Sequence, residues 1–178
     1  MICGPLEFST ERLDAHQVGG EDLEFLEVLF QDERVTATLG GPRDRDRIRD
    51  DIGRWLAHWD AQGFGLWILR ERELENSVGW VMLHVTDTGG PGVEVGWTIA
   101  ADRWRRGLGS EAGAAAVHIG FETLGLHEIV SFTLVGNVAS RRVMEHLGFT
   151  YDCETEHAGL PHVLYRLDHT TWEQHRNG

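Results

Sequence analysis

Apolar and polar positions recur at two different spacings along this chain. Residues 93–99 alternate large apolar side chains with polar or small ones, which is the period of a β-strand. Residues 21–31 and 44–62 instead place apolar side chains three and four positions apart, which is the period of a helix. The pattern therefore predicts both helices and strands.

Short apolar runs and turn signals complete the predicted order of elements. Further strands are predicted at residues 6–13, 65–70, 77–85, 129–135, 149–156 and 161–167, and further helices at residues 107–124 and 138–147. Glycine-rich breaks at residues 40–42 and 87–92 separate some of these elements. No internal repeat or linker is visible, so the sequence predicts one α/β domain over residues 1–168, with about seven strands and about four helices. The polar C-terminal tail, residues 169–178, is expected to fray.

Composition narrows the classes of function. The formal net charge of −13 argues against nucleic acid or an anionic membrane surface as a partner. It favours a cationic substrate, although net charge reports mainly on solubility. No apolar run approaches the roughly 18 residues of a membrane span, and the N-terminus lacks the pattern of a secretory signal. Cys3 and Cys153 lie far apart without metal-ligand spacing, which favours free thiols and a cytoplasmic location.

A loop with two close glycines lies between a predicted strand and a predicted helix, at residues 104–112 (WRRGLGSEA). Gly107 and Gly109 have no side chain, so phosphate oxygens could approach the backbone there. The first N–H groups of a helix lack internal partners and carry partial positive charge. Three cations add to this potential: Arg103, Arg105 and Arg106. The loop therefore suits a diphosphate group, although the spacing alone is equally explained by an ordinary helix start with small-residue packing.

The motifs around this loop resemble those of GNAT acetyltransferases, specifically the ribosomal-protein-alanine N-acetyltransferase-like (RimJ/RimL-like) branch. The loop is similar to that branch's W-G-x-G-[YL]-[AG]-[ST]-E-A segment, with Arg105 in place of its common glycine. Residues 93–99 (VEVGWTI) look like the branch's fourth strand. Residues 137–149 resemble its N-x-x-S helix and the glycine-phenylalanine pair that follows, and residues 10–13 (TERL) resemble its first strand. The resemblance spans nearly the whole chain in the expected order.

This resemblance implies a GNAT-like fold with a mixed, mostly antiparallel sheet, and acetyl-CoA as co-substrate. It implies direct transfer of the acetyl group to a primary amine, either a protein N-terminus or a small molecule. The residues expected to bind the donor are Trp97, Thr98, Ile99, Arg105, Arg106, Gly107, Leu108, Gly109, Ser110 and Asn137. The histidines show no metal-ligand pattern, so no metal is expected. The family often forms dimers, so a homodimer is allowed.

Two side chains are the candidates for proton transfer. Glu94 lies in the strand expected to line the acetyl group, where burial would raise its pKa and suit it to act as a base. Its alternative is an exposed strand glutamate. Ser140 is the candidate acid by resemblance to the serine of the N-x-x-S motif, and its alternative is hydrogen bonding to the helix backbone. Asn137 suits both a helix N-cap and a contact to cofactor or water.

Other functions remain open at this stage. The chain could be an acyl-CoA-binding or regulatory module without catalysis, or an acetyltransferase that modifies antibiotics or polyamines. All 16 basic residues are arginine, which excludes a lysine nucleophile. A nucleotide-binding domain with a phosphate loop is disfavoured for the same reason, since no lysine follows Gly107 or Gly109.

Overall fold

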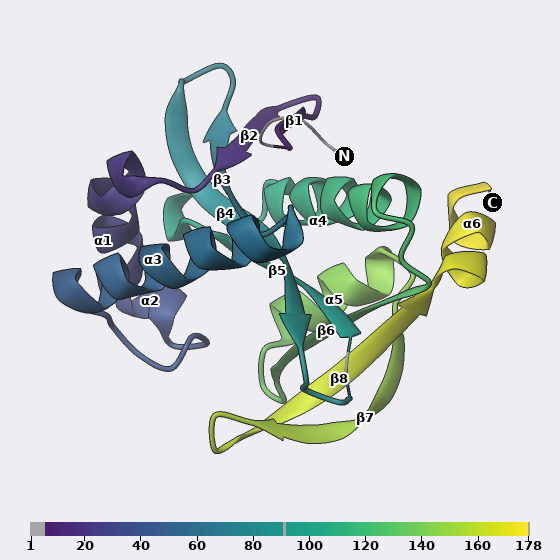
Figure 1. The fold of residues 1–178 in the computed structure, drawn as a ribbon. Coiled ribbons are helices and arrows are strands. Elements are labelled where there is room, and N and C mark those ends of the chain that lie inside the picture. The colour runs from purple at the N-terminus through teal and green to yellow at the C-terminus, as the bar shows by residue number, and fades with distance from the viewer. Residues whose placement is uncertain (1–5, 91, 178) are drawn as a thin grey trace. The chain divides into compact units, whose positions relative to one another are not determined.

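The computed structural model describes residues 6–90 and 92–177. Within these residues, eight strands form one mixed, mostly antiparallel sheet in the order β1-β2-β3-β4-β5-β6-β8-β7, accompanied by six α-helices (Figure 1). The predicted single-domain α/β fold is confirmed, with eight strands and six helices where about seven and about four were predicted. Cys3 lies outside the described residues.

The strands and helices have the following bounds. The strands are β1 (Phe8–Ser9), β2 (Leu13–Gln17), β3 (Leu66–Glu71), β4 (Asn76–Thr86), β5 (Gly92–Ile99), β6 (Glu128–Leu134), β7 (Thr150–His157) and β8 (Leu160–Asp168). The helices are α1 (Leu23–Gln31), α2 (Glu33–Thr36), α3 (Arg45–Gln62), α4 (Leu108–His118), α5 (Val138–His146) and α6 (His169–Asn177). A π-helical turn, Ile119–Thr123, continues α4.

The described chain divides into two compact units. The first unit holds residues 6–82 and 97–112, and the second holds residues 83–90, 92–96 and 113–177. Strands β4 and β5 and helix α4 each contribute residues to both units. The candidate loop belongs to the first unit, whereas Glu94, Asn137 and Ser140 belong to the second.

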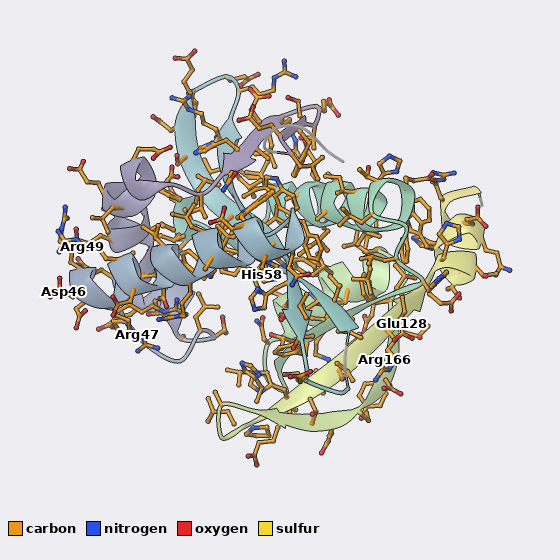
Figure 2. All side chains as sticks on the ribbon, viewed as in Figure 1. Asp46, Arg47, Arg49, His58, Glu128 and Arg166 are labelled. Atoms are coloured by element: carbon orange, nitrogen blue, oxygen red, sulfur yellow. The ribbon has the colours of Figure 1, made fainter. Side chains whose placement is uncertain are left out.

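In the first unit, β2, β3 and the first part of β4 form an antiparallel meander, and α1 packs beside α3 (Figure 1). The Asp44 carboxylate caps α3 by accepting a hydrogen bond of 2.8 Å from the Arg47 amide. Gly63 ends the helix at a φ of 75°, a left-handed conformation that glycine adopts without strain. Charged side chains pair along the first turns of this helix, as the bond of 2.9 Å between Arg49 and Asp46 shows (Figure 2).

In the second unit, β8 lies between β6 and β7 and pairs antiparallel with both. The Arg166 guanidinium of β8 ties its neighbours together, because it donates to Glu128 on β6 and to Asp152 on β7 at 2.7 Å each (Figure 2). It also donates to the carbonyl of Gly89 at 2.7 Å. The pairing of β8 with β6 and β7 is therefore stabilised by the Arg166 side chain as well as by backbone hydrogen bonds.

The expectation of a frayed tail is wrong for residues 169–177, which form α6. Trp172 is buried, with its ring centroid 5.0 Å from that of Phe121. The Asp168 carboxylate accepts from the Thr171 amide at 2.9 Å at the start of the helix. The single predicted strand at residues 6–13 is in fact interrupted, with a turn between β1 and β2 in which the Thr10 amide donates to the Leu13 carbonyl.

Candidate functional site

The glycine loop begins where β5 ends, and a side chain fixes its path. The Trp104 indole N–H donates to the Ile99 carbonyl at 2.7 Å, so the ring folds back onto the strand. Arg105 then adopts a φ of 61° and Gly107 a φ of 79°. Gly107 adopts this left-handed conformation without strain, whereas in Arg105 the Cβ atom causes steric strain. Arg105 stands where the resembled motif has a glycine, and its backbone explains why glycine suits that position.

The end of β5 packs directly against the start of α4. Thr98 and Ile99 are buried and Trp97 is half-buried. A Cβ added to Gly109 would lie 3.6 Å from Cδ1 of Trp97 and 3.7 Å from Cγ1 of Ile99. The helix therefore approaches the strand as closely as a side chain of one carbon allows. These predicted donor-binding residues are brought together within the first unit.

The first turn of α4 offers unpartnered amide groups. The helix starts at Leu108, and the Glu111 amide is the first to bond back, to the Gly107 carbonyl at 3.0 Å. Among the described residues, no acceptor is found for the amides of Leu108, Gly109 and Ser110. Such amides carry partial positive charge and form a ready site for a phosphate oxygen.

Two of the three loop arginines are committed to a buried carboxylate. Glu71 at the end of β3 has a side chain that is 4% exposed. Its carboxylate binds Arg103 Nε at 3.2 Å and Arg106 at 2.6 Å. The Arg105 side chain is exposed and makes no ion pair or hydrogen bond within the part of the chain that the structure describes. Of the three cations expected next to the loop, Arg105 alone has no partner among the described residues.

A second carboxylate, Glu111 of α4, anchors the loop from its other side. It accepts hydrogen bonds from the Thr10 hydroxyl, and from the amide and side chain of Arg12 at 2.9 and 2.6 Å. Burial acts to raise the pKa of Glu111, but these hydrogen bonds and the Arg12 charge outweigh burial and hold the pKa below its usual value. Glu111 is therefore ionised at neutral pH and binds Arg12 as a charge-assisted pair.

Sequence reasoning missed Glu71, Arg12 and Glu111 as parts of this site. Arg12 and Glu111 both lie within quoted motifs, TERL and WRRGLGSEA, so a pairing between the two motifs was a signal available in the sequence. Glu71 gave no comparable signal, because a glutamate between a strand and a polar turn is ordinarily solvated.

Glu94 of β5 lies in the second unit and is 8% exposed. Its partner in the parallel pairing with β6 is Val130. No hydrogen bond or ion pair to the Glu94 side chain is found among the described residues, and burial raises its pKa to about 8. The predicted burial of this carboxyl is thus present, and the alternative of an exposed strand glutamate does not hold. A group with this pKa can accept a proton near physiological pH.

Asn137 and Ser140 lie at the start of α5, also in the second unit. The Asn137 side-chain oxygen accepts from the Ser140 amide at 3.2 Å, and its amide nitrogen donates to the Thr133 hydroxyl at 2.9 Å. Asn137 is therefore the helix N-cap, as expected. Only the Ser140 backbone takes part in this cap, so its half-buried hydroxyl is left without a partner within the described residues.

The described residues hold no group of three or more His, Cys, Asp or Glu side chains that could bind a metal ion. Nor do they include a helix long and apolar enough to cross a bilayer. His157 and His162 do meet, with ring centroids 5.5 Å apart, and His157 Nδ1 lies 3.0 Å from the Thr88 hydroxyl. Burial, followed by the charge of His162, lowers the pKa of His157, so this ring is neutral at pH 7.

Comparison with known proteins defines the class. Residues 12–150, most of the chain, match the family described as Acetyltransferase (GNAT) domain. The chain belongs to the GNAT acetyltransferase family, whose members use acetyl-CoA as the acetyl donor and amines as acceptors. It is an acetyltransferase.

Named relatives agree with this class. The chain is 32% identical over 154 residues to the FsC-acetyl coenzyme A-N(2)-transacetylase of Aspergillus fumigatus. The matched region covers 80% of this chain and 64% of that protein. It is 26% identical over 142 residues to the uncharacterized N-acetyltransferase YoaA of Bacillus subtilis. The matched region covers 79% of this chain and 80% of that protein.

Solved structures agree on the fold. An acetyltransferase from Agrobacterium tumefaciens superposes with a TM-score of 0.80 at 25% identity, over 94% of this chain and 96% of that chain. The spermidine N-acetyltransferase of Vibrio cholerae, solved with CoA and spermine, superposes with a TM-score of 0.74 at 15% identity, over 92% of this chain and 98% of that chain. The ribosomal-protein-S5-alanine acetyltransferase of Vibrio fischeri superposes with a TM-score of 0.73 at 16% identity, over 94% of this chain and 98% of that chain. At these low identities the last two show the fold alone.

Proposed function

We propose that this chain is a ribosomal-protein-alanine N-acetyltransferase-like enzyme that moves an acetyl group from acetyl-CoA directly to a primary amine. The observation that carries the catalytic part of the proposal is Glu94, a buried carboxyl with no partner among the described residues and a pKa of about 8. A carboxyl buried for structural reasons alone is normally paired, because an unpaired one costs folding free energy. Its presence here without a partner among the described residues favours a functional role over a binding module without catalysis.

The residues at the start of α4 fit the donor. The pyrophosphate of acetyl-CoA is an anion, and the unpartnered amides of Leu108, Gly109 and Ser110 would hold it through hydrogen bonds. The Arg105 guanidinium, which has no partner among the described residues, adds a cation to the same loop. We assign Trp97, Thr98 and Ile99 to the pantetheine arm, because they form the end of the strand from which the loop departs. Asn137 is assigned to the donor as well.

Two side chains would move protons in this scheme. Acetyl-CoA, when bound, supplies the thioester that the amine attacks. Glu94 would take a proton from the incoming amine, directly or through water. Burial raises its pKa to about 8, close to the pH at which the enzyme would work, and this suits a general base. The Ser140 hydroxyl would donate a proton to the departing thiolate and regain one from solvent, since the helix cap uses only the Ser140 backbone amide. Each such transfer typically contributes about 10²–10⁴-fold.

The acceptor is assigned first to the α-amine of a protein N-terminus, on the motif resemblance to the ribosomal-protein-alanine branch. A small cationic amine, such as a polyamine or an aminoglycoside antibiotic, is the second candidate. It is favoured by the net charge of −13, which attracts polycations at long range. We further propose a cytoplasmic enzyme, on its cysteine usage, and one that could work as a homodimer.

A thiol-release assay tests the proposal. The protein is incubated with acetyl-CoA and three amine sets: peptides with N-terminal alanine or serine, spermidine, and aminoglycosides. Turnover that requires peptide supports the first acceptor, and turnover with spermidine or an aminoglycoside moves the assignment to a cationic small molecule. CoA binding with no turnover on any amine would instead favour the acyl-CoA-binding module.

A further inference from the structure

The loop that precedes α4 is held by two carboxylates: one binds Arg106 directly, and the other acts on Arg106 through Arg12. Glu71 binds the guanidinium of Arg106 at 2.6 Å. Glu111 binds Arg12 at 2.6 Å, and Arg12 in turn donates to the backbone carbonyl of Arg106 at 2.7 Å. Arg106 is therefore fixed at its side chain and at its backbone by different partners. All four residues belong to the first unit.

Fixing the Arg106 carbonyl also fixes the next amide. The C=O and N–H groups of a trans peptide point in opposite directions within one rigid plane. Because the Arg106 carbonyl faces Arg12, the Gly107 N–H must point away from Arg12. No acceptor for the Gly107 amide is found in the described part of the chain. Gly107 thus extends the row of unpartnered amides that continues through Ser110.

The pairing with Glu71 makes two loop cations, Arg103 and Arg106, unavailable to a ligand. Arg103 and Arg106 stand on either side of Trp104 and Arg105, and both point their guanidinium groups at the same buried carboxylate. Moving either arginine to a ligand would leave Glu71 buried with fewer partners, and an uncompensated buried charge is strongly destabilising. The two side chains are therefore part of the scaffold rather than free to bind an anion.

We propose that Glu71 and Arg12 are positioning residues for the donor loop. They hold Arg106 from both ends, so that the amides from Gly107 to Ser110 and the Arg105 guanidinium are the groups that bind the pyrophosphate. The inference rests on the proposed donor site, and it alters the expected role of Arg106 from a ligand contact to a support. Neither Glu71 nor Arg12 needs to touch the donor.

The test compares two donors and measures binding separately from turnover. Glu71→Gln keeps the size of the side chain and removes its charge. It should raise the Kd of CoA about tenfold by calorimetry, equivalent to about 1.4 kcal/mol. It should raise the KM for acetyl-CoA similarly and leave kcat within about twofold. With S-acetylpantetheine, which has no pyrophosphate, kcat/KM should not change, whereas general damage to the fold would lower both donors alike.

A matched control and a second variant keep the result interpretable. Glu73→Gln makes the same chemical change two residues away, at an exposed side chain that pairs with neither arginine, and should bind CoA like the wild type. If Glu71→Gln fails to fold, Arg12→Lys is decisive. Lysine can keep the ion pair with Glu111, but it lacks the fork that also reaches the Arg106 carbonyl. It should show the same donor-dependent loss.

The failures of the two proposals are distinguishable. A wild-type protein that binds no CoA overturns the proposed donor site and this inference with it. A wild type that binds CoA, with Glu71→Gln or Arg12→Lys binding equally well, overturns only the positioning role. An equal loss of kcat/KM with both donors also overturns it.

Discussion

Glu94 lies directly opposite Val130 in the parallel pairing of β5 with β6. Side chains at paired positions project from the same face of a sheet, so an apolar neighbour occupies the place where a cation would be needed to stabilise a carboxylate. Val130 is itself buried. This relationship explains why burial raises the pKa of Glu94 to about 8, and two predictions depend on it.

The first prediction concerns the pH dependence of turnover. A base must be deprotonated to act, so kcat/KM at saturating acceptor should rise with pH up to an apparent pKa near 8. Glu94→Gln should lower kcat by about 100-fold, remove this limb of the profile, and leave the Kd of CoA unchanged. The measurement is steady-state turnover between pH 6 and 10 beside calorimetric CoA binding. Equal activity in Glu94→Gln would exclude Glu94 as the base.

The same carboxyl should make stability depend on pH. Its pKa is raised above the ordinary value of 4.5, so the native state keeps a proton that the unfolded state has lost between pH 4.5 and about 8. Stability from this group is therefore fully present below pH 4.5 and declines by up to about 1.4 kcal/mol per pH unit until about pH 8. Urea unfolding should show a shallower decline in Glu94→Gln. Glu154→Gln, at an exposed strand position, should retain the wild-type slope.

The backbone of Arg105 permits a third prediction. At a φ of 61°, replacement by glycine relieves a steric conflict that replacement by alanine keeps. Arg105→Gly should therefore be more stable than Arg105→Ala by about 1 kcal/mol, the reverse of the usual order of these two residues. Both variants lose the guanidinium, so both should bind CoA several-fold more weakly. A glycine variant that is less stable than the alanine variant would contradict the strain argument.

The sequence predicted those features that local pattern encodes. Alternation in residues 93–99 located β5, and the glycines at 107 and 109 located the start of α4. What could not be predicted were contacts that only tertiary packing creates. Glu71 and Arg103 are separated by 31 intervening residues, and nothing at either position distinguishes a buried ion pair from two solvated charges. The pairing reassigns two of the three expected cations.

Ser140 and Asn137 can be separated experimentally, because they act through different atoms. Ser140→Ala removes the unpartnered hydroxyl and leaves the amide that Asn137 caps, so stability should stay within about 0.5 kcal/mol of the wild type while kcat falls at least tenfold. Asn137→Ala removes the cap and should cost about 1 kcal/mol of stability. Thermal unfolding and kcat, measured on both variants, check the separation. An unchanged kcat in Ser140→Ala would remove it as the acid.

The C-terminal helix gives the last prediction, at a place where polar composition was misleading. Residues 169–177 carry one large apolar side chain, Trp172, and a single anchor in a polar segment leaves little periodic signal. The Trp172 ring packs on Phe121 and lies beneath the Arg176 guanidinium, 4.6 Å from its carbon to the ring centroid. Trp172→Ala should therefore destabilise the protein by about 3–5 kcal/mol in urea unfolding. The control, Gln174→Ala, alters an exposed side chain of the same helix and should change stability by less than about 0.5 kcal/mol. If Trp172→Ala changed the stability as little as Gln174→Ala does, α6 would contribute no more to stability than the frayed tail first expected.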